Sequence, residues 1–128
     1  MIITRKQILQ LGHFINKIKQ KNIKCSLNTK YKILKIGQLI NQEFEISTIL
    51  LDDITLKYAE LNENLQPKIN NEGGILINPD QVIELQRDIE DFQKMEIQIS
   101  DFYFSIDELE ELELSFEELE YFMPFIKI

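Results

Sequence analysis

A regular stripe of apolar and small residues runs through the middle of the chain and constrains its fold more than any other feature. The stripe alternates steps of four and three along residues 29–65: Ile33, Gly37, Ile40, Phe44, Ser47, Leu51, Ile54, Tyr58, Leu61 and Leu65. This spacing is typical of one face of a helix that packs along a partner. We therefore predict a helix over 29–65, about 55 Å long at 1.5 Å per residue and ended by Pro67. Such a length requires cover, either from other helices of the chain or from a second protein.

A shorter amphipathic helix is predicted before this stripe. Thr4-Arg5-Lys6-Gln7 has the form of a capping box, in which a hydroxyl and a glutamine satisfy the first free N–H groups of a helix. Four apolar residues then recur at helical spacing, which predicts a helix over 5–20: Ile8, Leu11, Ile15 and Ile18. Residues 21–28 interrupt the pattern and form a connector.

After the long helix the pattern predicts a turn, a third helix and a minor β element. Gly73-Gly74 is turn chemistry, and Ile75-Leu76-Ile77 is a short strand candidate. Asn78 followed by Pro79 is typical of a helix start, so we predict a helix over 79–95 that folds back antiparallel on the long one. Residues 96–99 alternate polar and apolar side chains, and we expect them to pair with Ile75–Ile77.

The C-terminal stretch SIDELEELELSFEELEYF holds eight carboxylates in two capping boxes, Ser105 to Glu108 and Ser115 to Glu118. Early acidic residues in a helix interact favourably with its dipole. The simplest interpretation is therefore two short helices with solvated polar faces, before Pro124 interrupts the second. The alternative is an acidic surface that imitates nucleic acid.

Together these elements predict a mainly α fold: amphipathic helices around a long central helix that forms a helical hairpin, with a minor β element. At 128 residues the chain suits one domain, 1–128, with a basic N-terminal helical part (1–42) and an acidic helical remainder (43–128). Apolar runs are too short to span a bilayer, and the N-terminus has no signal-peptide pattern. The lone Cys25 agrees with a reducing cytoplasm, so we expect a cytoplasmic protein without a membrane partner.

Charge is segregated along the chain. Residues 1–42 contain nine basic and no acidic residues, whereas residues 43–128 contain five basic and all 22 acidic residues. One interpretation is that the two parts neutralise each other within the fold. The other is that the protein presents two faces to two kinds of partner.

Two candidate partner-binding surfaces follow from this pattern. The first is acidic and consists of the C-terminal glutamates that are least committed to capping: Glu110, Glu111, Glu113 and Glu120. The second is the apolar stripe of the long helix around Phe44, Leu51 and Tyr58, which could bind another protein or a second copy.

A Lys-rich patch is the alternative, anion-binding candidate. Its members lie in the basic third of the chain: Lys17, Lys19, Lys21, Lys24, Lys30, Lys32 and Lys35. Lysine contacts to phosphate do not read sequence, so nucleic-acid binding here would be weak and salt-sensitive.

The residues needed for catalysis are scarce. His13 is the only histidine and is expected to be a partly buried structural residue, and Cys25 has no second histidine to help it hold zinc. Gly73-Gly74 lacks the lysine of a phosphate-binding loop. The carboxylates of the third helix share one helical face: Glu84, Asp88 and Asp91. Asp52 and Asp53 of the long helix could face these carboxylates across the hairpin and hold metal ions, but such sites usually add histidines. We therefore predict no catalytic, cofactor-binding or metal-binding residue and no cofactor.

Two segments of the chain carry a resemblance to a known group of proteins: NTKYKILKIGQLINQEFE, which enters the long helix, and the ending MEIQISDFYFSIDELEELELSFEELEYFMPFI. Across about residues 28–128, this order of features resembles small uncharacterised proteins of tailed bacteriophages and prophages of AT-rich bacteria. The resemblance implies a phage gene product that works by binding, and it transfers no functional residue.

The combined expectation is a non-enzymatic phage-encoded binding protein that engages and inhibits or modulates a host protein, such as a nucleic-acid-handling defence complex. The principal alternative is a virion or assembly component that self-associates through the long helix. A third is a weak nucleic-acid-binding protein that uses the Lys-rich N-terminal part.

Overall fold

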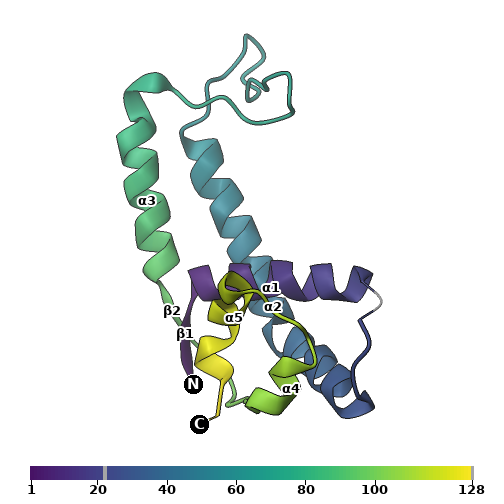
Figure 1. The fold of residues 1–128 in the computed structure, drawn as a ribbon. Helices are drawn as coiled ribbons and strands as arrows, with labels where there is room; N and C mark the ends of the chain where they lie inside the picture. The colour runs from purple at the N-terminus through teal and green to yellow at the C-terminus, as the bar shows by residue number, and fades with distance from the viewer. Residues whose placement is uncertain (22, 128) are drawn as a thin grey trace.

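The computed structural model describes residues 1–21 and 23–127 and confirms a mainly α fold (Figure 1). Its elements follow in the order β1 (Ile2–Thr4), α1 (Arg5–Gln20), α2 (Leu27–Lys57), η1 (Pro79–Gln81), α3 (Val82–Lys94), β2 (Glu96–Gln98), α4 (Ile106–Glu110), α5 (Phe116–Phe122) and η2 (Met123–Phe125). The two η elements are single 3₁₀ turns. None of the helices within the described residues is long and apolar enough to cross a membrane.

The hydrophobic core lies where α1 crosses the first half of α2 and where α4, α5 and η2 close around them. Three phenylalanines from the C-terminal part, Phe104, Phe122 and Phe125, are fully buried there beside Ile8, Leu11 and Ile36. Aromatic rings pack edge to face across the core, with Phe104 and Phe14 each 5.4 Å from Phe122 between ring centroids. The C-terminal segment therefore completes the core begun by α1 and α2.

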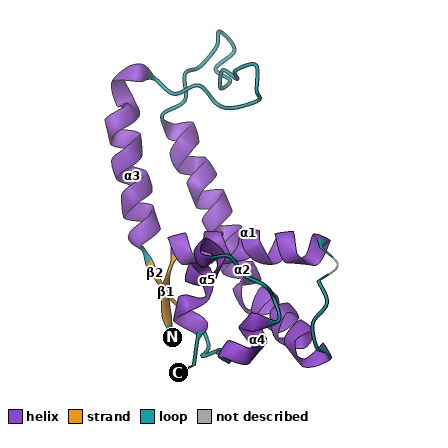
Figure 2. Cartoon of the chain, in the orientation of Figure 1, coloured by secondary structure: helices purple, strands orange, loops and turns teal. Residues whose placement is uncertain are grey.

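The predicted strand at 96–99 forms, but its expected partner was wrong. β2 lies beside β1 at the N-terminus (Figure 2) and pairs with it in antiparallel orientation. The register sets Ile3 opposite Ile97. The N-terminal ammonium extends this contact, because it donates to the Ile99 carbonyl at 2.8 Å and pairs with Asp101 at 2.6 Å. Ile75 and Ile77 instead make isolated bridges to Ile69 and Ala59.

The N-terminal helix is confirmed at the predicted bounds. Thr4 accepts from the Gln7 N–H at 3.2 Å while the Gln7 side chain accepts from the Thr4 N–H at 2.8 Å, which is the capping box expected from sequence. Gly12 of this helix lies against the ring of Phe44 on α2. Arg5 reaches α2 as well, donating to Glu43 at 3.1 Å and to Ser47 at 2.9 Å. These contacts fix α1 across the middle of α2.

The second half of α2 continues outward beside α3, and the two form the predicted helical hairpin (Figure 1). At the far end of α2, the Tyr58 hydroxyl donates to Asp88 of α3 at 2.5 Å, and Lys57 pairs with the same carboxylate at 3.5 Å. We call residues 48–95 the arm and the remaining described residues, 1–21, 23–47 and 96–127, the body. Ser47 is the boundary because it is the last residue of α2 buried against the body.

The predicted length of the long helix was wrong at its C-terminal end. α2 ends at Lys57, so it has 31 residues and is about 46 Å long at 1.5 Å per residue. Leu61 and Leu65 continue the apolar spacing but lie in an irregular segment. The Asn62 side chain accepts from the N–H groups of Asn64 and Gln66 there. Asparagine competes with helical hydrogen bonding in this way, so local turn chemistry overrides the apolar period.

We call residues 58–78, between α2 and η1, the tip loop. Backbone hydrogen bonds close it into a narrow ribbon, for example from the Glu60 N–H to the Leu76 carbonyl at 2.8 Å. The predicted turn at Gly73 is confirmed, since this residue has a φ of +84°. Leu65 also adopts a positive φ, +60°, which is an outlier for a bulky side chain.

The third helix begins later than predicted, because Pro79–Gln81 form a 3₁₀ turn before α3. The Asn78 side chain donates to the Gln81 side chain at 3.1 Å and makes no hydrogen bond to the described backbone of this turn. Both C-terminal capping boxes are confirmed: Ser105 and Ser115 each exchange hydrogen bonds with the glutamate three residues on.

Candidate functional site

Part of the acidic C-terminal run contacts the start of α2, and the rest is exposed. Glu111 accepts hydrogen bonds from the Thr29 and Ser26 hydroxyls at the start of α2, and that from Ser26 is 3.1 Å. The bond from Thr29 holds the pKa of Glu111 below its ordinary value, and Ser26 adds to the effect. The first turn of α2 carries Lys30 and neutral residues only, so Glu111 supplies a negative charge at the positive end of this helix.

Glu108 completes this contact. Its carboxylate pairs with Lys32 of α2 at 2.7 Å and accepts from Asn28 at 3.4 Å, in addition to its capping role at Ser105. Burial alone would raise the pKa of Glu108, but the hydrogen bonds from Lys32 and Ser105 outweigh it and lower the pKa. The carboxylates of Glu108 and Glu111 therefore hold α4 at the start of α2.

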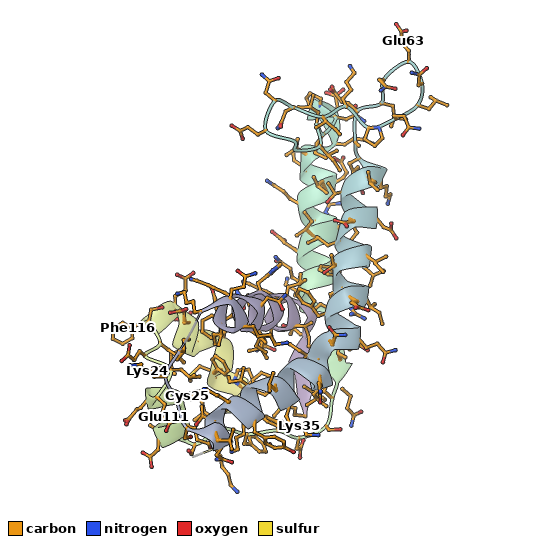
Figure 3. All side chains as sticks on the ribbon, turned by 90° about the vertical axis from the view of Figure 1, so that its right-hand side faces the viewer. Lys24, Cys25, Lys35, Glu63, Glu111 and Phe116 are labelled. Carbon is orange, nitrogen blue, oxygen red and sulfur yellow. The ribbon has the colours of Figure 1, made fainter. Side chains whose placement is uncertain are left out.

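The four glutamates proposed from sequence as a partner surface do not share one environment. Glu111 is half-buried and committed to α2, whereas Glu110, Glu113 and Glu120 are exposed, and their carboxylates accept no hydrogen bond from the described residues. Figure 3 draws Glu111 beside the connector that holds Lys24 and Cys25. The exposed three remain a candidate surface, but a continuous phosphate-like row that includes Glu111 does not form.

Part of the Lys-rich patch faces these acids. Lys32 is paired with Glu108 and lies 5.9 Å from the centroid of the Phe104 ring. Glu118 has a lowered pKa, mainly because it accepts from the Ser115 N–H, with contributions from Lys17 and Lys21. The exposed members of the patch are Lys17, Lys19, Lys21, Lys24, Lys30 and Lys35. These contacts support the interpretation in which the basic and acidic parts neutralise each other within the fold.

The apolar stripe predicted as a docking surface is covered largely by the chain itself. Tyr58 is buried against α3, Phe44 is half-buried against α1, and Leu51 is half-buried. The sequence left open whether other helices of the chain or a second protein cover the stripe. In the structure, helices of the same chain pack against Phe44 and Tyr58. The prediction that these three residues offer a docking surface therefore needs correction, because all three are at least partly buried.

Residues with catalytic chemistry are dispersed. His13 was expected to be partly buried, but it is exposed, and its imidazole packs edge-on against Phe44 with ring centroids 5.3 Å apart. Cys25 is half-buried in the connector. Among residues 1–21 and 23–127, no group of three or more histidine, cysteine, aspartate or glutamate side chains is placed to hold a metal ion.

The arm exposes more large hydrophobic side chains than the sequence pattern indicated, because most of them lie off the predicted stripe and the end of the stripe, at Leu61 and Leu65, is not helical. Nine large hydrophobic side chains are exposed on it: Ile49, Leu56, Leu61, Leu65, Ile69, Leu76, Val82, Ile83 and Met95. The arm also contains ten acidic and four basic residues, so it carries −6 of the net charge of −8. Figure 3 shows it projecting from the body, with Glu63 at its far end.

An open groove runs along one side of the arm between α2 and α3. Leu50, Ile54 and Met95 line it above the buried ring of Phe92. Asp53 from α2 and Asp91 from α3 border the groove, and the ion pair of Lys57 with Asp88 closes its outer end. An apolar floor between two carboxylates can accept an apolar side chain with positive charge on either side of it.

The two aspartates of this groove were noted from sequence only as metal-ligand candidates. The helical period showed that Asp91 and Asp88 share a face, but the pairing of α3 with α2 was needed to bring Asp53 into the same groove. No protein-family model, curated protein or solved structure matches the chain.

Proposed function

We propose that the chain is a non-enzymatic, phage-encoded binding protein whose arm engages a positively charged surface of a host protein and thereby inhibits or modulates it. The observation that carries this proposal is the combination, on one projecting hairpin, of nine exposed large hydrophobic residues and a net charge of −6. Exposed apolar patches rimmed by charge are characteristic of protein-binding surfaces.

The two properties of the arm favour different aspects of recognition. Apolar side chains such as Leu65 and Ile83 supply affinity, because burying them in an interface removes apolar area from water. The carboxylates supply orientation and a faster encounter with a basic partner. Two arms side by side would bring like charges together, so the charge argues against self-association of long helices in parallel register.

The surfaces that bind nucleic acid are a fitting class of target. Such surfaces place lysine and arginine next to the phosphate backbone. An acidic arm with exposed apolar residues can therefore compete with nucleic acid for the same surface. This supports a nucleic-acid-handling defence complex as the host partner, in agreement with the phage context that the sequence resemblance implies.

The experiment is capture of a partner from a lysate of a bacterial host with an AT-rich genome, followed by competition with duplex DNA. We expect one stoichiometric partner, which DNA displaces from the protein. A tip-loop variant, Leu65→Ser with Ile69→Ser, should lose most of the capture.

A matched variant on the body, Phe116→Ser with Met123→Ser, removes two equally exposed apolar side chains and should retain capture. Equal loss in both variants would move the binding surface away from the arm. Co-purification with phage structural proteins in place of a host protein would favour the assembly alternative, and turnover of a substrate would overturn the proposed class.

A further inference from the structure

The first turns of α2 carry an exposed apolar stripe with lysines on both sides. Leu27, Tyr31 and Leu34 follow each other at steps of four and three, so they share one face of the helix, and they are 83%, 57% and 53% exposed. The helical period places Lys30 on one side of this face and Lys35 on the other. We call these five residues the basic stripe.

The basic stripe has the features that the arm groove can accept. Peptide helices that bind in grooves use apolar anchors at i, i+4 and i+7, which is the spacing of Leu27, Tyr31 and Leu34. The groove offers an apolar floor, and Asp53 and Asp91 stand on its two sides as the lysines stand on the two sides of the stripe. Apolar surface therefore meets apolar surface, and each lysine meets a carboxylate.

We propose that the basic stripe of one copy of this chain docks in the arm groove of a second copy. The anchors lie on Leu50, Ile54 and Met95, and the two lysines of the stripe pair with Asp53 and Asp91. A helix laid on the α2–α3 hairpin in this way makes a local three-helix arrangement, in which side chains of the third helix fill the groove between the first two.

The contact cannot form within one molecule. Stripe and groove both belong to α2, which is a continuous helix from Leu27 to Lys57. Tyr31 and Asp53 are 22 residues apart on it, about 33 Å at 1.5 Å per residue. Figure 3 shows Lys35 and the arm at opposite ends of the molecule.

The contact is heterologous, because the stripe and the groove are different surfaces. Each copy can receive one neighbour and dock on another, so the assembly is either a closed ring or an open chain. It uses the arm in a different way from binding to a host protein, and it stands whether or not such a partner exists. It also differs from the parallel pairing of long helices, which the acidic charge of the arms opposes.

The first test is sedimentation of the purified 15.2 kDa protein over concentrations from about 10 μM to about 1 mM, where small interfaces associate. We expect the average mass to rise with concentration, and to rise less as NaCl increases from about 50 mM to about 500 mM, because salt screens exposed charges. A constant monomer mass over the whole range at low salt would overturn the proposal.

Charge reversal provides the sharper test. One variant carries Lys30→Asp and Lys35→Asp, and the other carries Asp53→Lys and Asp91→Lys. Each alone sets like charges against each other at the contact and should sediment as a monomer. Mixed in equal amounts they should associate again, because the acidic stripe of the first fits the basic groove of the second, and the basic stripe of the second fits the acidic groove of the first.

Two further variants separate this contact from general electrostatic attraction. Tyr31→Ala with Leu34→Ala keeps every charge and should weaken association about tenfold or more. Glu110→Lys with Glu120→Lys reverses two exposed charges on the body and should leave association unchanged. Circular dichroism and melting temperature verify that each variant is folded. Association of either charge-reversal variant by itself, or failure of their mixture to associate, would contradict the proposed contact.

Discussion

The arm and the body share one helix but are stabilised in different ways. Among the described residues, the body buries fifteen hydrophobic side chains and exposes eight large ones, whereas the arm buries three and exposes nine. The arm depends on the packing of α3 with α2 and with α1, and on polar contacts such as Tyr58 with Asp88. Regions with few buried apolar contacts open at lower free energy and commonly serve in binding. The difference indicates that the body maintains the fold while the arm is free to interact.

The largest expected effect tests the core of the body. Phe104→Ala removes a fully buried ring that packs 5.4 Å from both Phe102 and Phe122, between ring centroids. We expect the free energy of unfolding to fall by about 3–5 kcal/mol, since this substitution removes buried apolar area and leaves a cavity. Chemical denaturation measures the change.

Phe116→Ala is the matched control, because the same ring is 92% exposed at the start of α5. Its effect should remain within about 0.5 kcal/mol. Similar losses for the two substitutions would mean that the C-terminal segment does not complete the core, and the contrast between body and arm would disappear.

The next effect tests the crossing of α1 and α2, which separates body from arm. A Cβ at Gly12 would lie less than 3 Å from the Phe44 ring, so Gly12→Ala must displace the ring and should destabilise the protein by about 1–3 kcal/mol. At Gly37 the nearest side-chain atom, on Ile15, would be 3.5 Å away, which is an ordinary contact.

Gly37→Ala should therefore be neutral or stabilising, by up to about 1 kcal/mol, because alanine favours the helix over glycine. Thermal melting of both variants measures the pair. A stable Gly12→Ala protein would show that α1 and α2 do not approach closely at this crossing.

Features set by neighbouring residues were predictable from sequence. The capping boxes at Thr4, Ser105 and Ser115 depend on a hydroxyl and a side chain three residues later, and all three form as expected. The mainly α class and the hairpin followed from apolar spacing over longer stretches. The predicted C-terminal end of α2 was wrong. The spacing of Leu61 and Leu65 suits a helix, but it is equally compatible with the turn that Asn62 stabilises.

Features set by distant residues were not predictable. Glu96–Gln98 could pair with any short apolar strand, and the choice of Ile2–Thr4 depends on how α1 and α3 bring both segments together. The commitment of Glu111 to Thr29 likewise requires two segments 82 residues apart to meet. The candidate site was missed for the same reason, since the groove forms from residues of two helices, with Asp53 on α2 and Asp91 on α3.

The third prediction concerns pH and separates the two kinds of glutamate on the body. Glu111 has a lowered pKa in the folded protein, so its contribution to stability is complete above the ordinary glutamate pKa. That contribution is lost as the pH falls through the lowered value. Glu111→Gln should therefore lose less stability than the wild type between about pH 6 and about pH 3.

Glu110→Gln is the control, because Glu110 is the neighbour of Glu111 at the end of α4 and is exposed. Its denaturation midpoints should follow those of the wild type at each pH. Identical pH profiles for all three proteins would show that the contact of α4 with the start of α2 does not depend on the charge of Glu111.

The smallest expected effect on stability addresses the tip of the arm. Leu65 has a φ of +60°, a conformation that costs a residue with a side chain about 1–2 kcal/mol, and its side chain is 75% exposed. Leu65→Gly removes that cost but gives the unfolded chain more freedom, so the melting temperature should rise slightly or stay the same. Glu113→Gly makes the equivalent change on the body, where φ is +51°.

The same two substitutions also test binding. Because a strained, exposed apolar residue persists where function requires it, Leu65→Gly should weaken capture of a host partner while Glu113→Gly should not. Calorimetry and the lysate capture measure the two effects, and full capture by Leu65→Gly would remove the tip loop from the binding surface.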